Sequence, residues 1–379
     1  MGGVISPALP SALLTIAHVT GERGFSGGEV QVFLLIEGLR KRGHHNVLLC
    51  PEGSRSHEEA RRRGIEARAI RARNEWSPRN WLGIWRELGR LRPDLVHLHS
   101  GHANWLGGLA ARPLGLPALT TRRMDRPVKR NLRTRLLYGS CVRRAVAISE
   151  SVARQLVAGG VPESMVRVVR SAVDPDALHP QRSREVTRAA EGLDAATPLL
   201  LAAAALVRRK GLDVLIQALA ELRGRGPEPA LWIAGQGPER ARLERLARAQ
   251  GLSSRVRFLG HRRDVPDLLL ACDVLALPSR REGLGVAALE AMALARPVVA
   301  SRAGGLREAV DHERTGLLVP PGDPPALAAA LARLLEEPQL RNRLGEAGPR
   351  WVAREFSLGR MVEAYERLYR QVVAEGARG

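Results

Sequence analysis

Residues 278–292 read PSRREGLGVAALEAM, and this stretch decides how the second half of the chain is interpreted. It follows an apolar run, residues 272–277, that is typical of a buried strand, and it leads into a strongly helix-forming segment, residues 287–295. Gly283 and Gly285 permit a tight backbone path between the two. The pattern predicts a strand, a glycine-containing loop and a helix, which is the repeating unit of a parallel α/β sheet.

Two carboxylates flank this loop, with Glu282 in the loop itself and Glu290 on the helix that follows. In open α/β sheets, ligands bind at the carboxyl ends of the strands. A carboxylate there can accept hydrogen bonds from sugar hydroxyls, and the free amides at a helix start can bind phosphate. Solvated glutamates account for most pairs at this spacing, so the glycines and the adjoining buried strand are what favour a binding site.

Short apolar strands alternate with helical segments along both halves of the chain. In the first half, strands are expected over 13–19, 46–50, 93–99, 118–121 and 145–149, with helices over 27–42 and 81–91. In the second half, strands are expected over 199–206, 231–234, 256–259, 274–277 and 298–300. The chain from residue 324 onward is expected to be helical throughout. This alternation predicts an α/β protein with parallel, doubly wound sheets.

Two Rossmann-like domains facing a central cleft fit the length of 379 residues. The expected boundaries are 1–178 for the first domain and 179–355 for the second. A C-terminal helix, residues 356–379, is expected to cross back to the first domain.

The composition narrows the classes of protein that fit. The longest uncharged apolar stretch, residues 198–207, is about half of what a membrane span needs. No secretory signal pattern is recognised at the start, and the three scattered cysteines form no metal or disulfide pattern. We therefore expect a reduced, cytoplasmic setting.

The net charge of +20 is unevenly distributed, because residues 1–180 carry 28 Lys and Arg against 15 Asp and Glu. Residues 122–144 hold nine basic residues against one acid, Asp125. Such a cluster indicates an anionic partner, although a solvated arginine-rich helix face explains it equally well. Zinc spacings, RNA-binding motifs and stacking aromatics are not recognised, so nucleic acid is not expected. An anionic membrane surface at the inner membrane face or an anionic acceptor is favoured.

Loops rich in glycine follow several of the expected strands. Gly27 and Gly28 start a helix after the first strand, where missing side chains let a substrate approach the backbone. Their spacing lacks the full dinucleotide fingerprint, so NAD is not expected. Arg209 and Lys210 follow the first strand of the second domain and can reach a diphosphate. Later strands are followed by Gly235, Gly304 and Gly305. Each loop alone is as readily an ordinary turn, but together they would converge on one cleft.

Three histidines, His97, His99 and His102, lie close together at the end of an expected strand. Alternation along a strand puts His97 and His99 on one face, and no carboxylate lies nearby in the sequence. A metal site is therefore not expected. Polar contact with substrate from His99 or His102 is the preferred interpretation.

This combination of motifs resembles the family 4 glycosyltransferases of the GT-B fold, over nearly the whole chain. The motifs that carry the resemblance are Glu282-x7-Glu290, Lys210-Gly211, Gly235-x-Gly237, Gly304-Gly305 and Gly27-Gly28-Glu29. The resemblance implies a hexosyltransferase-type enzyme that moves a sugar, with retention and without a metal or other cofactor, from a nucleotide-diphosphate donor to a hydroxyl. A UDP- or GDP-sugar is the expected donor.

The resemblance also implies that domain 1–178 binds the acceptor and domain 179–355 the nucleotide sugar, and it implies roles for individual residues. Glu282 would contact the donor sugar and Glu290 the nucleotide ribose, while Lys210, assisted by Arg209, would neutralise the leaving diphosphate. The remaining donor-binding positions that it implies are Gly27, Gly28, Gly235, Leu284, Gly285, Gly304 and Gly305. Cations and amides aimed at the departing charge suit such a reaction.

The chain departs from the family pattern at two places. Ala205 stands where members carry a diphosphate-binding arginine, so other cations must act there. Arg123 stands near a position where many members have a histidine that contacts the donor sugar. The segment containing Arg122 and Arg123 resembles a subgroup associated with lipopolysaccharide and other envelope glycans. Both arginines are therefore candidates for binding a phosphate or an anionic acceptor.

The sequence thus predicts a retaining glycosyltransferase with a lipid-linked or lipopolysaccharide-type acceptor. Two alternatives remain open at this point. One is a nucleotide-sugar epimerase of the same two-domain shape, and the other is a non-catalytic protein that binds nucleotide sugars or anionic lipids.

Overall fold

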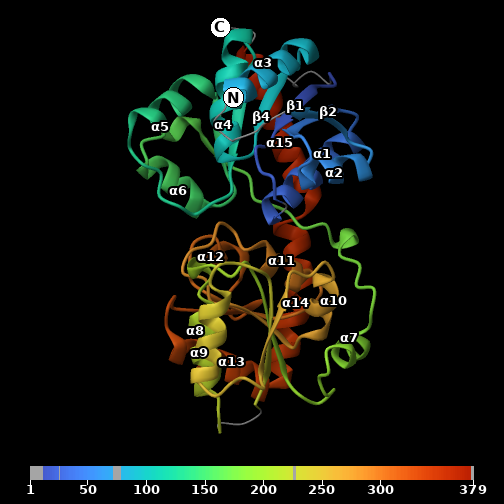
Figure 1. Cartoon of the computed structure of the whole chain (residues 1–379), viewed down its shortest axis with the longest axis vertical. Helices are drawn as coiled ribbons and strands as arrows, with labels where there is room; N and C mark the ends of the chain where they lie inside the picture. Colours follow the sequence, from blue (N-terminus) through green and yellow to red (C-terminus); the bar gives the residue numbers. More distant parts are fainter. Residues whose placement is uncertain (1–11, 25, 71–77, 225–227, 377–379) are drawn as a thin grey trace, which may run out of the picture.

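Two parallel sheets, one in each half of the chain, organise this protein (Figure 1). The structure is a computed structural model that describes residues 12–24, 26–70, 78–224 and 228–376. Each sheet has helices on both faces, and the two halves stack end to end along the long axis of the molecule. The predicted fold class, two Rossmann-like doubly wound α/β domains, is confirmed. We call the two halves the N-lobe, built on strands β1–β7, and the C-lobe, built on strands β8–β13.

The N-lobe sheet has seven strands in the order β3-β2-β1-β4-β5-β6-β7. Their bounds are β1 Thr15–Val19, β2 His45–Pro51, β3 Glu66–Ile70, β4 Leu95–Leu98, β5 Ala118–Arg122, β6 Arg144–Ala147 and β7 Val166–Val168. The helices between them are α1 Gly27–Lys41, α2 Arg55–Arg62, α3 Pro78–Leu91, α4 Gly101–Ala111, α5 Leu132–Leu136 and α6 Glu150–Ala158. The strand order reverses between β1 and β4, which is where ligands bind in such sheets.

The C-lobe sheet has six strands in the order β10-β9-β8-β11-β12-β13. Their bounds are β8 Leu199–Ala203, β9 Ala230–Ala234, β10 Val256–Gly260, β11 Val274–Leu277, β12 Val298–Ser301 and β13 Gly316–Val319. Its helices are α7 Arg184–Ala190, α8 Leu212–Glu221, α9 Arg240–Ala249, α10 Val265–Ala271, α11 Val286–Ala293, α12 Leu306–Ala309, α13 Pro324–Glu336 and α14 Pro338–Glu355. Here the order reverses between β8 and β11, so the two sheets repeat one plan.

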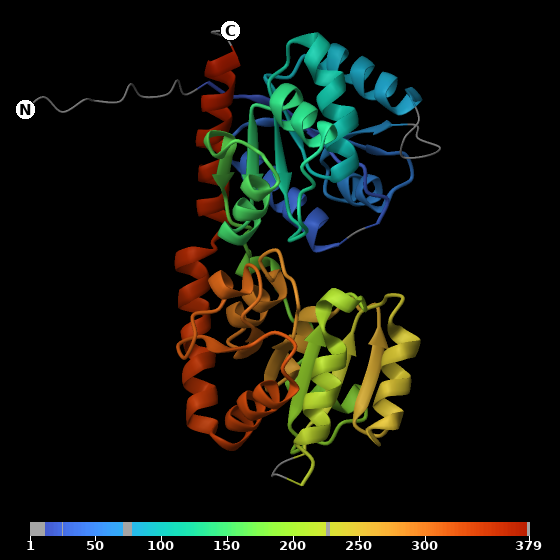
Figure 2. The ribbon, with the colours of Figure 1, turned by 90° about the vertical axis from the view of Figure 1, so that its left-hand side faces the viewer.

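The last helix, α15 (Leu358–Gly376), lies on the N-lobe although α14 before it lies on the C-lobe (Figure 2). Its buried residues, among them Tyr365 and Tyr369, pack with residues of α1, β1 and β4 in one apolar cluster. The expectation of an unbroken helix from residue 324 is wrong. The chain leaves the helix at Glu337, which precedes Pro338, and again at residues 356–357. A residue before proline is disfavoured in helical conformation, which explains the first break.

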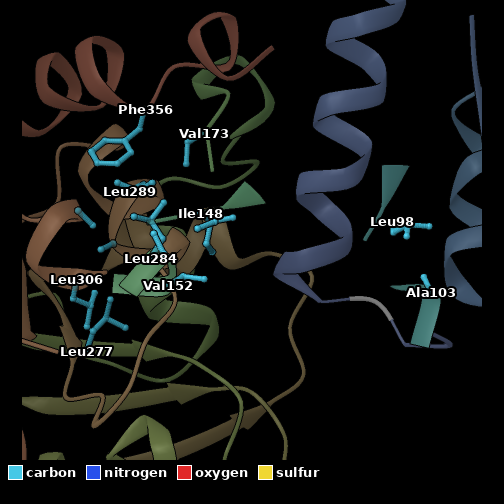
Figure 3. Packing of buried hydrophobic residues seen from close by; sticks show 14 of the residues in the cluster. Leu98, Ala103, Ile148, Val152, Val173, Leu277, Leu284, Leu289, Leu306 and Phe356 are labelled. Carbon is cyan, nitrogen blue, oxygen red and sulfur yellow. The ribbon is translucent and has the colours of Figure 1, made fainter. Parts of the chain in front are cut away.

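The apolar core continues from one lobe into the other (Figure 3). Ile148 and Val152 of the N-lobe lie in the same buried cluster as Leu284 and Leu306 of the C-lobe. A side chain at Gly283 would place its Cβ 3.2 Å from the Ile148 Cδ1 atom. The loop after β11 is therefore packed against the N-lobe.

Candidate functional site

The helices that follow the central strands begin differently in the two lobes. In the N-lobe, α1, α4 and α6 begin at Ser26, Ser100 and Ser149, whose side chains cap the first helical amides. In the C-lobe, α8 and α11 begin at Gly211 and Gly285 with no side-chain cap. Uncapped amides at a helix start favour an anion. The carboxyl edge of the C-lobe sheet, where these amides are uncapped, is therefore better suited to bind phosphate than the corresponding edge of the N-lobe sheet.

A lysine and a glutamate from two of these loops form an ion pair. Lys210, in the short turn after β8, donates from Nζ to Oε2 of Glu282, in the loop after β11. Ser279 also donates to Oε2 of Glu282, at 3.2 Å. Arg209 lies on the other side, with its Nη1 atom 3.9 Å from Oε1 of the same glutamate. Two cations and one buried carboxylate therefore meet at the carboxyl ends of β8 and β11.

The turn that carries Lys210 is held by Gly211, whose φ of 65° lies in the left-handed region. Any side chain at Gly211 would collide with the carbonyl oxygen of Pro278. Because only glycine fits both the angle and the space, the β8 and β11 loops can approach closely enough for the ion pair to form.

Glu290, on the second turn of α11, is partly buried, and no described residue donates a hydrogen bond to its carboxylate. Loss of solvent raises the pKa of Glu290 to about 7. Desolvation without a compensating donor disfavours the ionised form. This carboxylate is thus available to a ligand that brings its own hydroxyl groups.

The glycines after β9 and β12 have close packing partners inside the C-lobe. A side chain at Gly235 would collide with the Ala204 carbonyl, and one at Gly304 or Gly305 with the carbonyls of Glu282 and Gly283. The Gly305 amide also donates to the Glu282 carbonyl at 3.0 Å. These glycines hold the site loops together, whatever else they bind.

Leu284 and Gly285 complete the loop before α11. Leu284 is buried in the apolar core that joins the two lobes. Gly285 has a φ of 90°, and a Cβ there would lie 2.5 Å from Leu306 Cδ2. Both residues therefore shape the backbone path that leads from Glu282 to the start of α11.

Gly27 and Gly28 open α1 on the N-lobe side. No described atom lies within 4 Å of the position that a Cβ at Gly27 would occupy. At Gly28 the nearest contacts are ordinary, with Arg123 Cδ at 3.7 Å. Internal packing does not require glycine at either position, and the missing side chains leave space above the helix start.

Arg123 follows β5 and lies next to this opening. Its guanidinium donates to the carbonyl oxygen and to Nδ1 of His99, both at 3.3 Å. Arg122 is directed elsewhere, since it donates to the carbonyl of Arg126 at 2.6 Å. Burial raises the pKa of the neighbouring Asp125, whose Oδ2 would lie 2.7 Å from a Cβ at Gly304. The loop after β5 thus contacts the C-lobe loops.

Three histidines, His18, His97 and His99, form a buried group behind Arg123. His18 Nδ1 is 2.9 Å from His99 Nε2, and His18 Nε2 is 2.9 Å from Asn46 Oδ1. Burial lowers the pKa of all three, that of His18 to about 4. All three rings are therefore neutral at physiological pH.

The partners at both ends of this group fix the tautomers. Asn46 donates from Nδ2 to the His44 carbonyl, so its Oδ1 accepts from His18 Nε2–H. A guanidinium only donates, so His99 Nδ1 accepts from Arg123 and His99 Nε2–H donates to His18 Nδ1. Both assignments give the same direction of hydrogen-bond donation, from Arg123 to His99, from His99 to His18 and from His18 to Asn46.

The same group is also the candidate metal site, because one ligand atom from each ring lies within 4.8 Å of the others. In this arrangement, however, the lone pairs of His18 and His99 already accept hydrogen bonds. His97 is bonded on both nitrogens, to Tyr369 at 2.6 Å and to Thr121 at 2.7 Å. A guanidinium also lies next to the group. The donor set therefore suits a hydrogen-bond network and does not fit a cation.

Sequence reasoning placed His99 and His102 near substrate. His99 is buried, with both ring nitrogens bonded, whereas the His102 side chain lies outside the described part of the structure. His18 and Asn46 were not anticipated. His18 could have been included only by assuming that β1 pairs with β4, because that pairing places His18 opposite His97.

Further polar contacts join the lobes around the site. Ser149 donates from Oγ to the Gly283 carbonyl at 2.7 Å. The amides of Glu150 and Ser151 donate to the two carboxylate oxygens of Glu308, at 3.1 and 3.2 Å. A pocket beside these contacts is lined by Glu150, Arg154, Gly304, Arg307 and Glu308. The site is thus assembled from loops of both lobes.

Two further features bear on the setting of the protein. Among the described helices, none is long and apolar enough to cross a membrane. The three cysteines, Cys50, Cys141 and Cys272, are buried and unpaired.

Comparison with known proteins adds to this geometry. Residues 25–177 match the family model described as Glycosyltransferase Family 4, and residues 183–351 match the one described as Glycosyl transferases group 1. The chain is 31% identical over 326 residues to an alpha-D-kanosaminyltransferase of Streptomyces kanamyceticus, covering 78% of this chain and 83% of that protein. It is 38% identical over 169 residues to the lipopolysaccharide core biosynthesis glycosyltransferase LpsD of Rhizobium meliloti, covering 45% and 48%.

Among solved structures, the Anabaena protein Alr3699/HepE in complex with UDP-glucose superimposes with a TM-score of 0.83. The match covers 94% of this chain and 99% of that one at 20% identity. At this identity the likeness establishes the shared fold alone.

Proposed function

The chain belongs to the glycosyltransferases of family 4 and group 1, and on that premise we propose that it transfers a sugar from a nucleotide-diphosphate donor to an acceptor hydroxyl with retention and without a metal ion. The observation that carries the proposal is the Lys210–Glu282 pair at the carboxyl ends of β8 and β11. Membership of this family favours a transferase over an epimerase or a non-catalytic binding protein.

The chemistry assigns one role to each side of the pair. In the reaction, the bond between the sugar C1 and the diphosphate oxygen breaks, and the acceptor oxygen bonds to C1 on the same face. The acceptor proton passes to the departing phosphate oxygen. Lys210 and Arg209 stabilise the charge that grows on the diphosphate, while Glu282 accepts hydrogen bonds from the sugar hydroxyls.

Pairing with Glu282 before the donor arrives keeps Lys210 in place. A cation that is already oriented costs no reorganisation when charge develops on the diphosphate, and removing such a contact typically lowers kcat by about 10²–10³-fold. The uncapped amides at the starts of α8 and α11 supply further donors. Glu290 is assigned to the nucleotide ribose.

The test is a panel of UDP-, GDP- and ADP-sugars with nucleotide release as the readout. Lys210→Ala and Glu282→Gln are expected to lose about 10²–10³-fold in kcat. Arg333→Ala, which removes an exposed ion pair with Glu313 far from the site, is the matched control. Turnover of Lys210→Ala within threefold of the wild type would contradict the mechanism. Product anomers by NMR test retention, and activity in EDTA tests metal independence.

We further propose a lipid-linked or lipopolysaccharide-type acceptor at the cytoplasmic face of the inner membrane. Supporting this, Met124, Leu132 and Leu136 are 48%, 69% and 45% exposed on the segment of residues 124–136. Basic side chains interleave with them at Arg126, Lys129, Arg130, Arg133 and Arg135. Apolar and basic residues together favour an anionic lipid surface.

Sedimentation with phosphatidylglycerol-containing vesicles tests this docking. Neutralising Arg126, Lys129, Arg130 and Arg135 to glutamine is expected to abolish sedimentation. Four exposed C-lobe arginines, changed in the same way, provide a charge-matched control: Arg245, Arg248, Arg314 and Arg343. Equal sedimentation of both variants would reject the surface.

A further inference from the structure

Arg123 is an arginine without a counter-ion. Among the described residues, no carboxylate oxygen lies within 4 Å of its guanidinium, and its buried Nε has no hydrogen-bond partner. Two of its five N–H groups are used, both on His99. The buried Arg188 of the C-lobe, by contrast, has a counter-ion, because it pairs with Asp273 and donates to three backbone carbonyls. A cation left uncompensated in a partly buried position is costly unless a ligand supplies the anion.

The position of Arg123 indicates which ligand that is. Its Cδ lies 3.7 Å from where a Cβ at Gly28 would be, beside the open space above Gly27. Its carbonyl oxygen lies 2.5 Å from where a Cβ at Gly283 would be, next to Glu282. Arg123 thus stands between the N-lobe opening and the C-lobe loop assigned to the donor.

We propose that Arg123 is an oxyanion receptor for the nucleotide-sugar donor, held in position by the hydrogen-bond chain through His99 and His18 to Asn46. The inference rests on the proposed function and names a recognition element for the same substrate. The oxyanion is either the donor diphosphate or a carboxylate on the transferred sugar. A guanidinium suits both, because its fork matches two oxygens at once.

The hydrogen-bond chain behind Arg123 fixes the position of its guanidinium group. His99 can accept from Arg123 only while its proton is on Nε2, and His18 Nδ1 holds it there. His18 in turn is held by the amide oxygen of Asn46. His18, His99 and Asn46 are therefore positioning residues, and of these four residues only Arg123 would touch the donor.

Calorimetric titration with UDP, UDP-glucose and UDP-glucuronate separates the two sources of oxyanion. In Arg123→Gln, an equal loss of about 10- to 100-fold for all three probes supports the diphosphate, and a loss confined to UDP-glucuronate supports the carboxylate. Arg123→Lys, which keeps the charge but not the fork, is expected to retain part of the affinity. Changes below twofold for every probe, in a variant with wild-type circular dichroism, would overturn the inference.

The outcome also distinguishes this inference from the proposed function. Wild-type protein that binds none of the UDP, GDP and ADP compounds would reject the proposed function, and Arg123 as a donor receptor with it. If the wild type binds these compounds and Arg123→Gln binds them with unchanged affinity, the role of Arg123 is rejected and the proposed function stands.

Asn46→Asp tests the positioning chain by its pH profile. A carboxylate at position 46 stabilises protonated His18, which then donates from both nitrogens. His99 must then present its Nε2 lone pair to His18, so that its Nδ1–H opposes the N–H groups of Arg123. The charged or titratable groups around His18 are His97 on β4, His99 directly after it, Arg123 after β5, and Tyr365 and Tyr369 on α15. Glu29 on α1 acts on Arg123.

The ratio of wild-type to Asn46→Asp affinity for the responsive probe is expected to rise at least fivefold from pH 8 to pH 5.5. Asn46→Leu, which cannot ionise, provides the control and is expected to give a constant ratio. A constant ratio for Asn46→Asp would overturn the positioning role, because a merely structural defect does not follow the titration of His18.

Discussion

Binding of a UDP-sugar is expected to release a proton near neutral pH, and Glu290 is its source. In the free protein this carboxylate is partly buried without a donor, and its pKa is raised to about 7. Ribose hydroxyls that donate to it would stabilise only the ionised form and so lower the pKa in the complex. The protonated fraction of Glu290 must then lose its proton whenever the ligand binds.

The magnitude follows from the raised pKa. With a pKa of about 7 in the free state and a value well below 6 in the complex, about half a proton is released at pH 7 and about nine-tenths at pH 6. Affinity is then highest above pH 7 and falls as the pH drops. Between pH 8 and pH 6 it falls about tenfold, or roughly 1.4 kcal/mol.

Calorimetric titration of UDP-glucose in buffers with different ionisation enthalpies measures the released proton directly. UDP-glucose is preferred to UDP because its diphosphate has no group that titrates near neutrality. Glu290→Gln keeps the size and a hydrogen-bonding oxygen but cannot ionise, so its binding should be independent of pH and buffer. A wild-type binding enthalpy at pH 6.5 that is the same in all buffers would refute the reasoning, as would equal proton release by Glu290→Gln.

Two further predictions concern stability. Because burial lowers the pKa values of His18, His97 and His99, the unfolded chain binds their protons first, and the free energy of unfolding should fall as pH drops below about 6.5. Glu290 has the opposite sign, because its pKa is raised to about 7, so it offsets part of the slope of unfolding free energy against pH that the histidines cause. Urea titrations from pH 7 to pH 5 measure this slope, and a flat profile would contradict it. Separately, a Cβ at Gly38 in α1 would collide with Val362 of α15, so replacing this glycine by alanine should cost about 1–3 kcal/mol in urea unfolding. The matched change in α3, where the nearest atom is 3.9 Å away at Gly89, should instead stabilise by up to about 1 kcal/mol, and equal effects of the two changes would count against close packing of α1 on α15.

Much of the fold could be predicted from the sequence because alternating apolar strands and helices leave a local pattern. Three strands, β3, β7 and β13, escaped prediction, and the first two have a weak pattern. The strand β3 reads EARAI and is only partly buried, and β7, at the sheet edge, has three residues, VRV. Neither offers an apolar run long enough to recognise. The third, β13, reads GLLV and is buried, but its apolar run is only three residues long, between a glycine and a proline.

The loops of the site could be predicted for the same reason, because glycines and charges after buried strands are visible in the sequence. The contacts between loops could not. The pairing of Lys210 with Glu282 spans 72 positions, and the hydrogen-bond chain from Arg123 to Asn46 joins residues on or directly after four strands. The spacing of His97 and His99 predicted a shared face, but their neighbour His18 comes from a strand 81 positions away from His99. Such contacts depend on which strands are adjacent in the sheet.

The placement of α15 has a consequence for how the molecule is made. Leu35 on α1, Ile16 on β1 and Leu95 on β4 lie in one buried cluster with side chains of α15, a helix that the ribosome synthesises only after the whole C-lobe. A nascent N-lobe therefore exposes this apolar surface to water while the entire C-lobe is still being translated. This surface is covered only after α15 has been translated, so we expect the growing polypeptide to depend on a holdase chaperone, and a stop codon before residue 358 to yield insoluble product.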